Sequence, residues 1–313
     1  MTKMTRISGN QGIKSLVRNV LVISALTIGA TLIGAPADRC EVVFADSQAA
    51  VLRADSLTGG HAVVSRDNKL MQPFGVAVGK SGELFVSDTG CLGLLGINPS
   101  SGEQRVIACG GILGVPFGIA VESNGMILVA NGQSILRVDP VSGAQTVVSS
   151  PNLFSVPLAV AVAGNGDIFV ADALGPIVRV DPSNGAQTLI SSGGYLKRPQ
   201  GIAVNGRNIY VTDVATEDMN FGVGRVIKID GRNGRQTVLS ENGNLIGPVG
   251  IAIAPSGDLI VGDPYTINPE SADLFDGAII RVDKDNGKQT LITRGNDVFV
   301  NPRGVAVIPS ATN

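Results

Sequence analysis

The stretch 116–121 reads Pro-Phe-Gly-Ile-Ala-Val, and near copies of it recur through the chain. The copies are spaced by 41 to 54 residues and begin at Pro73, Pro116, Pro157, Pro199, Pro248 and Pro302. Each of the first five is followed by an apolar run that ends at Asp or Asn, a second apolar run, a turn closed by Gly, and a run that begins with Gln. A period of this length, built from short strands, is typical of a β-propeller.

The repeat that begins at Pro157 predicts four antiparallel strands, which together make one blade. The strands are expected at residues 160–162, 167–171, 177–180 and 187–191. The turn 181–185 reads Asp-Pro-Ser-Asn-Gly, in which Pro presets φ and Gly accepts a left-handed backbone. We expect the Gly-Ile-Ala-Val strand to be innermost, because its small residues suit the place where blades converge.

The two ends of the repeated region complement each other. Residues 41–46, 51–55 and 61–65 match the second, third and fourth strands of a blade, while residues 302–308 match only the first strand. We therefore predict that the C-terminal strand pairs beside residues 41–46 and closes the ring, which removes free sheet edges. The predicted fold is all-β, a six-bladed β-propeller with four antiparallel strands per blade.

Residues 1–37 do not fit the repeat and read as a secretory signal peptide. Basic residues precede an apolar run from Val20 to about Gly34, and Ala35-Pro36-Ala37 supplies small residues for cleavage. An uncleaved anchor is the alternative, although the run is short for a membrane span. We expect cleavage near Ala37, a single propeller domain over residues 38–313, and a periplasmic or secreted product.

The charge of the exported part argues against two classes of partner. The chain has 24 Lys+Arg and 26 Asp+Glu, and its first 37 residues hold four basic side chains and no acidic ones. The remainder therefore carries a net charge of about −6, which disfavours nucleic acid and anionic membrane surfaces. We expect a monomer whose partner is a small molecule or a protein.

Export also bears on the three cysteines, because disulfides persist outside the cytoplasm. Cys91 immediately precedes the third strand of its blade, and Cys109 ends the fourth. The turn 98–102 between these strands brings the two cysteines almost opposite each other, so we predict a Cys91–Cys109 bridge, with two buried thiols as the alternative. Cys40 should lie at the other end of a neighbouring blade.

Two loops between second and third strands are longer than the rest, and they belong to adjacent blades. Loop expansions on one face of a repeat scaffold often carry function. The candidate ligand-binding residues in these loops are Glu217, Asp218, Phe221, Tyr265, Glu270, Asp273 and Asp276. Their acids could hold Ca²⁺, which prefers oxygen ligands, or a cationic or sugar-like ligand. We slightly prefer a pair of ordinary solvated loops whose acids point to water, and we assign no cofactor beyond the Ca²⁺ alternative.

The residue before the opening Gly of each copy should ring the mouth of the central channel. These residues are Phe74, Phe117, Leu158, Gln200, Val249 and Arg303. Gln200 and Arg303, the polar members, are candidate ligand-binding residues. Arg303 could bind a carboxylate or phosphate with two parallel hydrogen bonds, or it could pair with an Asp at the end of a second strand, which we slightly prefer.

Residues that obey the repeat are expected to serve the fold. The second strands end at Asp46, Asp88, Asn131, Asp172, Asp213 and Asp263, whose side chains can accept hydrogen bonds from backbone amides. Basic residues recur before the third-strand turn at Arg53, Arg137, Arg179, Lys228 and Arg281. His61 occupies a position that is Gln in the other copies. A single His excludes a metal cluster of several His residues, and the place of His61 on an outermost strand argues against a Ser-His-Asp triad.

The Pro-x-Gly-Ile-Ala-Val opening and the strand end at Asp resemble the NHL-repeat propellers and the wider six-bladed group of SMP-30/gluconolactonase and strictosidine-synthase-like proteins. The resemblance covers about residues 38–310 and implies architecture more than activity. Lactonases of that group hold a divalent metal with Asn, Asp and Glu at the channel mouth, some of them just before the opening Gly. Here those positions carry Phe74, Phe117, Leu158, Gln200, Val249 and Arg303, so that metal pattern is absent.

Two functions remain open from the sequence. The preferred one is a non-catalytic, exported propeller that binds a small molecule or protein through the loop-rich face around the channel. The alternative is a hydrolase, lyase or lactonase that uses carboxylates of the two long loops, with or without Ca²⁺.

Overall fold

The computed structural model describes residues 39–214, 223–266, 276–295 and 298–309, all within the compact unit Pro36–Asn313. The predicted signal peptide lies outside these residues. The described chain is all-β and contains no helix. Its described segments accordingly include no apolar helix that is long enough to cross a membrane.

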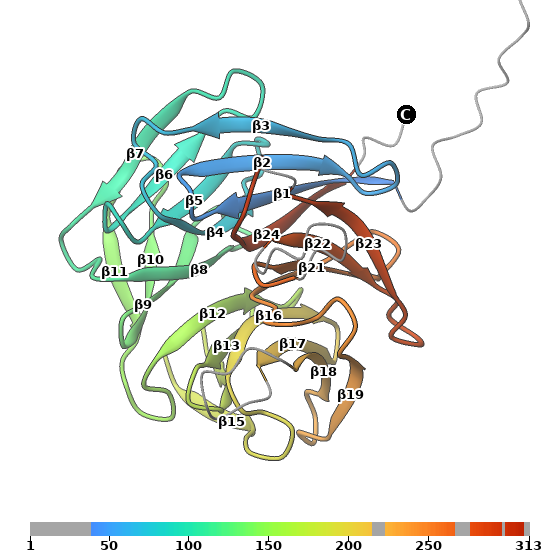
Figure 1. Cartoon of the computed structure of the whole chain (residues 1–313). Helices are drawn as coiled ribbons and strands as arrows, with labels where there is room; N and C mark the ends of the chain where they lie inside the picture. Colours follow the sequence, from blue (N-terminus) through green and yellow to red (C-terminus); the bar gives the residue numbers. More distant parts are fainter. Residues whose placement is uncertain (1–38, 215–222, 267–275, 296–297, 310–313) are drawn as a thin grey trace, which may run out of the picture. The chain divides into compact units, whose positions relative to one another are not determined.

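The described strands form six antiparallel sheets of four strands each, so the chain is a six-bladed β-propeller (Figure 1). The closing blade consists of β24, β1, β2 and β3, and the second to sixth blades follow in chain order from β4. The strands are β1 (Cys40–Asp46), β2 (Ala50–Asp55), β3 (His61–Arg66), β4 (Pro73–Val78), β5 (Leu84–Asp88), β6 (Gly93–Ile97), β7 (Gln104–Cys109), β8 (Pro116–Val121), β9 (Ile127–Asn131), β10 (Ser134–Val138), β11 (Gln145–Ser149), β12 (Pro157–Val162), β13 (Ile168–Asp172), β14 (Ile177–Val180), β15 (Gln187–Ser191), β16 (Pro199–Asn205), β17 (Asn208–Val214), β18 (Gly224–Asp230), β19 (Gln236–Glu241), β20 (Gly250–Ile253), β21 (Leu259–Asp263), β22 (Ala278–Val282), β23 (Gln289–Arg294) and β24 (Pro302–Pro309).

The predicted ring closure is confirmed. β24 pairs antiparallel with β1, with Phe44 opposite Val305 and Asp46 opposite Pro302. In Figure 1 the red C-terminal strand lies beside the blue strands of the N-terminal half of the ring. The strand that opens each repeat is the innermost strand of its blade, as the small residues of the repeated hexapeptide predict.

The glycine of the hexapeptide lets neighbouring inner strands approach closely. A Cβ on Gly201 would lie 2.2 Å from the carbonyl oxygen of Val249 in the next blade, and one on Gly250 would lie 2.1 Å from that of Arg303. No side chain fits at such distances, so glycine is required there. Ala159 holds the corresponding position in the fourth blade.

The turn that follows the third strand of each blade ends in a glycine, and this glycine also lies against the preceding blade. Gly185 has a φ of 73°, and a Cβ on it would lie 2.2 Å from the carbonyl oxygen of Val148 in the preceding blade. The same contact with the preceding blade recurs at every copy of the turn, at Gly59, Gly102, Gly143, Gly185, Gly234 and Gly287. The turn therefore packs directly on its neighbour.

The Gln that begins each outer strand fastens its blade to the preceding one. Gln187 donates from Nε2 to Ser149 Oγ at 2.9 Å, and Ser149 Oγ donates to the carbonyl of Gly185 at 2.8 Å. At the junction where the ring closes, His61 takes the place of Gln, and its Nδ1 lies 2.9 Å from Thr293 Oγ1. His61 therefore serves the fold, as its position in the repeat predicts.

The loops that link one blade to the next are held by a buried anchor and a strand-end carboxylate. The anchors, each three residues before the repeated Pro, are Leu70, Leu113, Phe154, Leu196, Leu245 and Phe299, all at most 4 % exposed. Asp46 accepts hydrogen bonds from the amides of Gln48, Val300 and Asn301, each at 2.8 Å. The structural role predicted for the strand-end Asp series is confirmed.

The recurring basic residues stabilise the blades locally. Arg137 pairs with Glu122, with Nε and Oε2 2.6 Å apart, and Lys228 lies over the ring of Tyr210. Ion pairs also join Arg53 to Glu41, Arg179 to Asp167 and Arg281 to Asp258. These side chains have structural partners, which agrees with their place in the repeat.

Candidate ligand-binding site at the channel mouth

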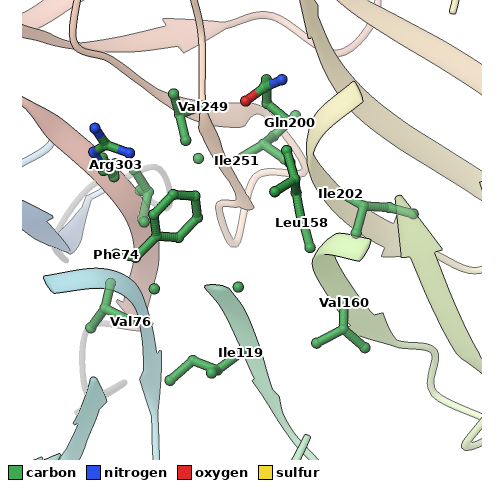
Figure 2. A pocket seen from close by; sticks show the side chains of 17 residues that line it. Phe74, Val76, Ile119, Leu158, Val160, Gln200, Ile202, Val249, Ile251 and Arg303 are labelled. Atoms are coloured by element: carbon green, nitrogen blue, oxygen red, sulfur yellow. The ribbon is translucent and has the colours of Figure 1, made fainter. Parts of the chain in front are cut away.

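The inner strands enclose a cavity at the mouth of the central channel, with about 400 Å³ of empty space that is partly open to solvent. A ring of branched apolar residues, one from each blade, also lines it: Val76, Ile119, Val160, Ile202, Ile251 and Val305. Figure 2 shows the first five of them around the opening. These residues occupy the fourth position of the hexapeptide. The repeated Ile or Val at that position is the signal in the sequence that points to this ring.

The outer ring of the cavity comes from the residues that precede the opening Gly. Phe74, Leu158, Gln200, Val249 and Arg303 line the cavity, as predicted for the channel mouth (Figure 2). The sixth predicted member, Phe117, packs edge-on against Phe74 with ring centres 5.2 Å apart. The mouth therefore combines apolar walls with one guanidinium and one amide.

Arg303 does not form the ion pair that we preferred from the sequence. The carboxylate of Asp46, opposite the start of its strand, is occupied by backbone amides of the linking loop. The Arg303 guanidinium instead lies over the Phe74 ring, with Cζ 5.3 Å from the ring centre. Its Nε is buried and has no hydrogen-bond partner. A buried N–H without an acceptor is costly, so Arg303 can offer a hydrogen bond to an incoming anion.

Gln200 is the second polar group at the mouth. Its Nε2 donates to the carbonyl of Arg198 at 3.1 Å, which holds the side chain in place. Figure 2 shows the side chains of Gln200 and Arg303 at separate positions around the opening, with Val249 between them. A ligand in the mouth would meet polar groups at separate points and apolar walls elsewhere, which is usual for small-molecule sites.

The two long loops are described only in part. Glu217, Asp218, Phe221, Glu270 and Asp273 lie outside the described residues. Tyr265 packs against Gly247, where a Cβ would lie 2.5 Å from its ring. The Asp276 amide donates to the Thr266 carbonyl at 3.2 Å. Their roles in ligand binding stay predictions.

Asp213 and Asp263 lie at the ends of the strands that lead into these loops, and the pKa of each carboxyl is raised. Burial raises the pKa of Asp213 to about 6, against the opposing effect of backbone hydrogen bonds from Lys197 and Arg198 and of the nearby Arg225. Burial likewise raises the pKa of Asp263 to about 6, although three backbone amides donate to it. Both carboxyls hold linking loops, so the shift reflects desolvation at a structural position.

Cys91 and Cys109 lie near each other but are free thiols in the structure. Cys109 pairs with Gly93, two residues beyond the position expected, because Cys91 lies in the turn before β6 begins. Cys109 Sγ is 3.2 Å from the Cys91 carbonyl oxygen, and burial raises the pKa of the Cys91 thiol to about 11. The disulfide stays a prediction, which the mass of the unreduced protein tests. Cys40 is buried at the far end of β1.

Within the described ranges, no three His, Cys, Asp or Glu side chains gather in a way that could hold a metal ion. Most acids of the long loops fall outside those ranges, so the Ca²⁺ alternative stays a prediction.

Comparison with known proteins supports the fold alone. No family model matches the sequence. No curated protein matches it either. Among solved structures, a chain in the crystal structure of a nidogen/laminin complex superposes with a TM-score of 0.70 at 14% identity, covering 86% of this chain and 98% of that chain. At this identity the similarity establishes a shared six-bladed propeller and leaves the function to be argued from the site.

Proposed function

We propose that this chain is an exported, NHL-like propeller that binds a small molecule or protein through the face around its channel mouth. The observation that carries the proposal is Arg303, which stands at the mouth of an apolar cavity with its buried Nε lacking an acceptor. Arg137, by contrast, is paired with the carboxylate of Glu122. The nidogen/laminin structure, a complex of proteins, fits a binding role for this architecture.

Obstruction of the mouth tests this proposal. Leu158 lines the cavity, so Leu158→Trp should fill it and abolish binding of fragments from a small-molecule library, detected by ligand-observed NMR on the full chain. Leu189→Trp is the matched control, because Leu189 is 49% exposed on the outer strand β15. Equal binding by wild type, Leu158→Trp and Leu189→Trp would place the ligand elsewhere and overturn the proposal.

The proposed export has a separate test. Expression in a bacterium with a secretory pathway, followed by fractionation and N-terminal sequencing, should yield a mature chain that begins near residue 38. A full-length product retained in the membrane would support the anchor, and one in the cytoplasm would refute export.

The hydrolytic alternative rests on the carboxylates of the long loops. A thermal-shift series with divalent metals and EDTA, followed by a panel of lactones and esters, tests it directly. Turnover that disappears with EDTA and in a Glu270→Gln, Asp273→Asn double variant would favour the enzyme.

A further inference from the structure

A second, polar cavity adjoins the channel cavity and shares two of its residues. It contains about 450 Å³ of empty space, partly open to solvent, between the closing blade and the second blade. Phe74 and Arg303 line both cavities, while the remaining polar wall comes from Ser47, Gln48, Gln72 and Thr89. Arg303 therefore stands where an apolar space meets a polar one.

The groups around the polar cavity can donate hydrogen bonds. Gln48 and Gln72 are exposed, and their side-chain amides each carry two donors. Thr89 Oγ1 donates to the Gln72 carbonyl at 3.0 Å, which fixes that wall. Together with the Arg303 guanidinium, these groups favour an acceptor-rich, anionic occupant.

The number of charges on that occupant is limited by two neighbouring carboxylates. Asp46 and Asp88 end the strands that flank this cavity, and both accept several backbone amides. Those amides satisfy their oxygens but do not remove their negative charges. Both carboxylates would repel a doubly charged phosphate about twice as strongly as a single carboxylate, whose one charge Arg303 can balance.

We propose that the ligand is an amphiphilic monocarboxylate, whose carboxylate binds Arg303 at the polar cavity and whose apolar part enters the channel. The guanidinium already lies over the Phe74 ring, so part of its freedom is lost before it binds a planar carboxylate. Leu158, Val249 and Ile251 supply apolar walls for the remainder of the ligand. This inference rests on the proposed function and adds the chemical class of its ligand.

A matched set of probes tests the class on the full chain by isothermal titration calorimetry. The probes are 4-phenylbutyrate, 4-phenylbutyramide and inorganic phosphate, with hexanoate and octanoate to vary the apolar part. We expect saturable binding of the acids, about 10-fold or more weaker binding of the amide because a charge-assisted hydrogen bond is lost, and no binding of phosphate.

Substitution of Arg303 should act on the acid alone. Arg303→Gln should weaken 4-phenylbutyrate about 10-fold or more and leave the amide unchanged, and Arg303→Lys should recover part of the affinity because the charge remains. Arg179→Gln is the control, since Arg179 lies in β14 and pairs with Asp167. Melting curves confirm that each variant is folded.

The outcomes separate this inference from the proposed function. If the acid and the amide bind with equal affinity, and Arg303→Gln changes neither, the proposed recognition of a carboxylate is overturned. If Leu158→Trp nevertheless abolishes that binding, the channel mouth is still the binding site. Preference for phosphate also overturns it. Failure of every acid to bind overturns it as well, and the proposed function survives only if neutral fragments still bind in a way that Leu158→Trp blocks.

Discussion

At the scale of single residues, the turn glycines are decisive because each satisfies two demands. Gly185 needs a left-handed backbone, and it also needs space against the Val148 carbonyl of the preceding blade. Gly166 makes only the first demand, since its φ is 91° and no atom lies within 4 Å of its virtual Cβ. A comparison of Gly185 with Gly166 therefore distinguishes the cost of the left-handed backbone from the cost of the contact between blades.

We predict that Gly185→Ala lowers the free energy of unfolding more than Gly166→Ala does. The left-handed backbone costs both variants about 1–2 kcal/mol, and the clash with Val148 should cost Gly185→Ala about 1–3 kcal/mol more. Urea unfolding measures the difference. Equal losses would show that the blades separate freely at this turn.

The buried carboxyls of Asp213 and Asp263 give stability a pH dependence of unusual sign. Their folded pKa of about 6 exceeds the ordinary value of 3.8, so the folded state binds more protons between these limits. Stability should therefore fall as the pH rises from about 4 to about 6, by at most about 3 kcal/mol for each carboxyl. Asp55, whose backbone hydrogen bonds lower its pKa to about 2, loses its contribution only below that window.

Asp263→Asn isolates this effect, because amides do not titrate and Asn131 already fills the equivalent position in the third blade. We expect a flatter dependence of the unfolding free energy on pH between 4 and 6.5 than in the wild type. Denaturant titrations at several pH values measure it. An unchanged slope would mean that Asp263 titrates near its ordinary pKa.

At the scale of elements, the outer strands are fastened across blades by a Gln–Ser pair. Gln187 contacts both Ser149 Oγ and the amide of Leu153, so one side chain joins a strand and a linking loop. The second blade lacks the serine, because Ala108 stands there, and Gln145 of the third blade donates to the Gly110 carbonyl instead. The Gln side chain therefore links the two blades at the same position even where its hydrogen-bond acceptor differs.

Gln187→Ala should destabilise the protein by about 1–3 kcal/mol, since it leaves partly buried donors and acceptors unpaired. The control is Gln133→Ala, in an exposed turn. A double-mutant cycle of Gln187→Ala with Ser149→Ala should show strong non-additivity. Additive effects would show that the two side chains do not act together.

The repeated pattern predicted these elements well because strands, turns and fastenings obey local rules that recur in every blade. The contact partner of Arg303 could not be predicted from the sequence. It depends on whether backbone amides already occupy the Asp46 carboxylate, and in the structure they do, so Arg303 lies over Phe74 instead. The pairing of Cys109 was also predicted wrongly. Cys91 lies in the turn before β6, so Cys109 pairs with Gly93, two residues further along the chain. The ring of Val and Ile residues that lines the channel mouth corresponds to the repeated fourth position of the hexapeptide.

At the scale of the whole molecule, one strand holds the ring closed. β24 pairs with β1 and also packs on its neighbours, with Val305 in the same apolar cluster as Phe44 and Phe299. Without it, β1 would expose an unpaired edge.

Val305→Asp should therefore open the ring, because it buries a charge in that cluster. We expect a loss of about 4 kcal/mol or more in stability, with aggregation seen by light scattering. Val141→Asp, at a side chain 91% exposed, is the control. A monomeric Val305→Asp protein with wild-type stability would refute the closing role of β24.

Closure by β24 also orders events in time. On a ribosome β1 is made long before β24, so the first blade waits for nearly all of the chain before its sheet is complete. The other five blades are each built from consecutive strands, so their sheets can be completed as the chain emerges. The first blade alone among the described blades therefore depends on strands from both ends of the ring, and its strand β1 has an unpaired edge until β24 is made.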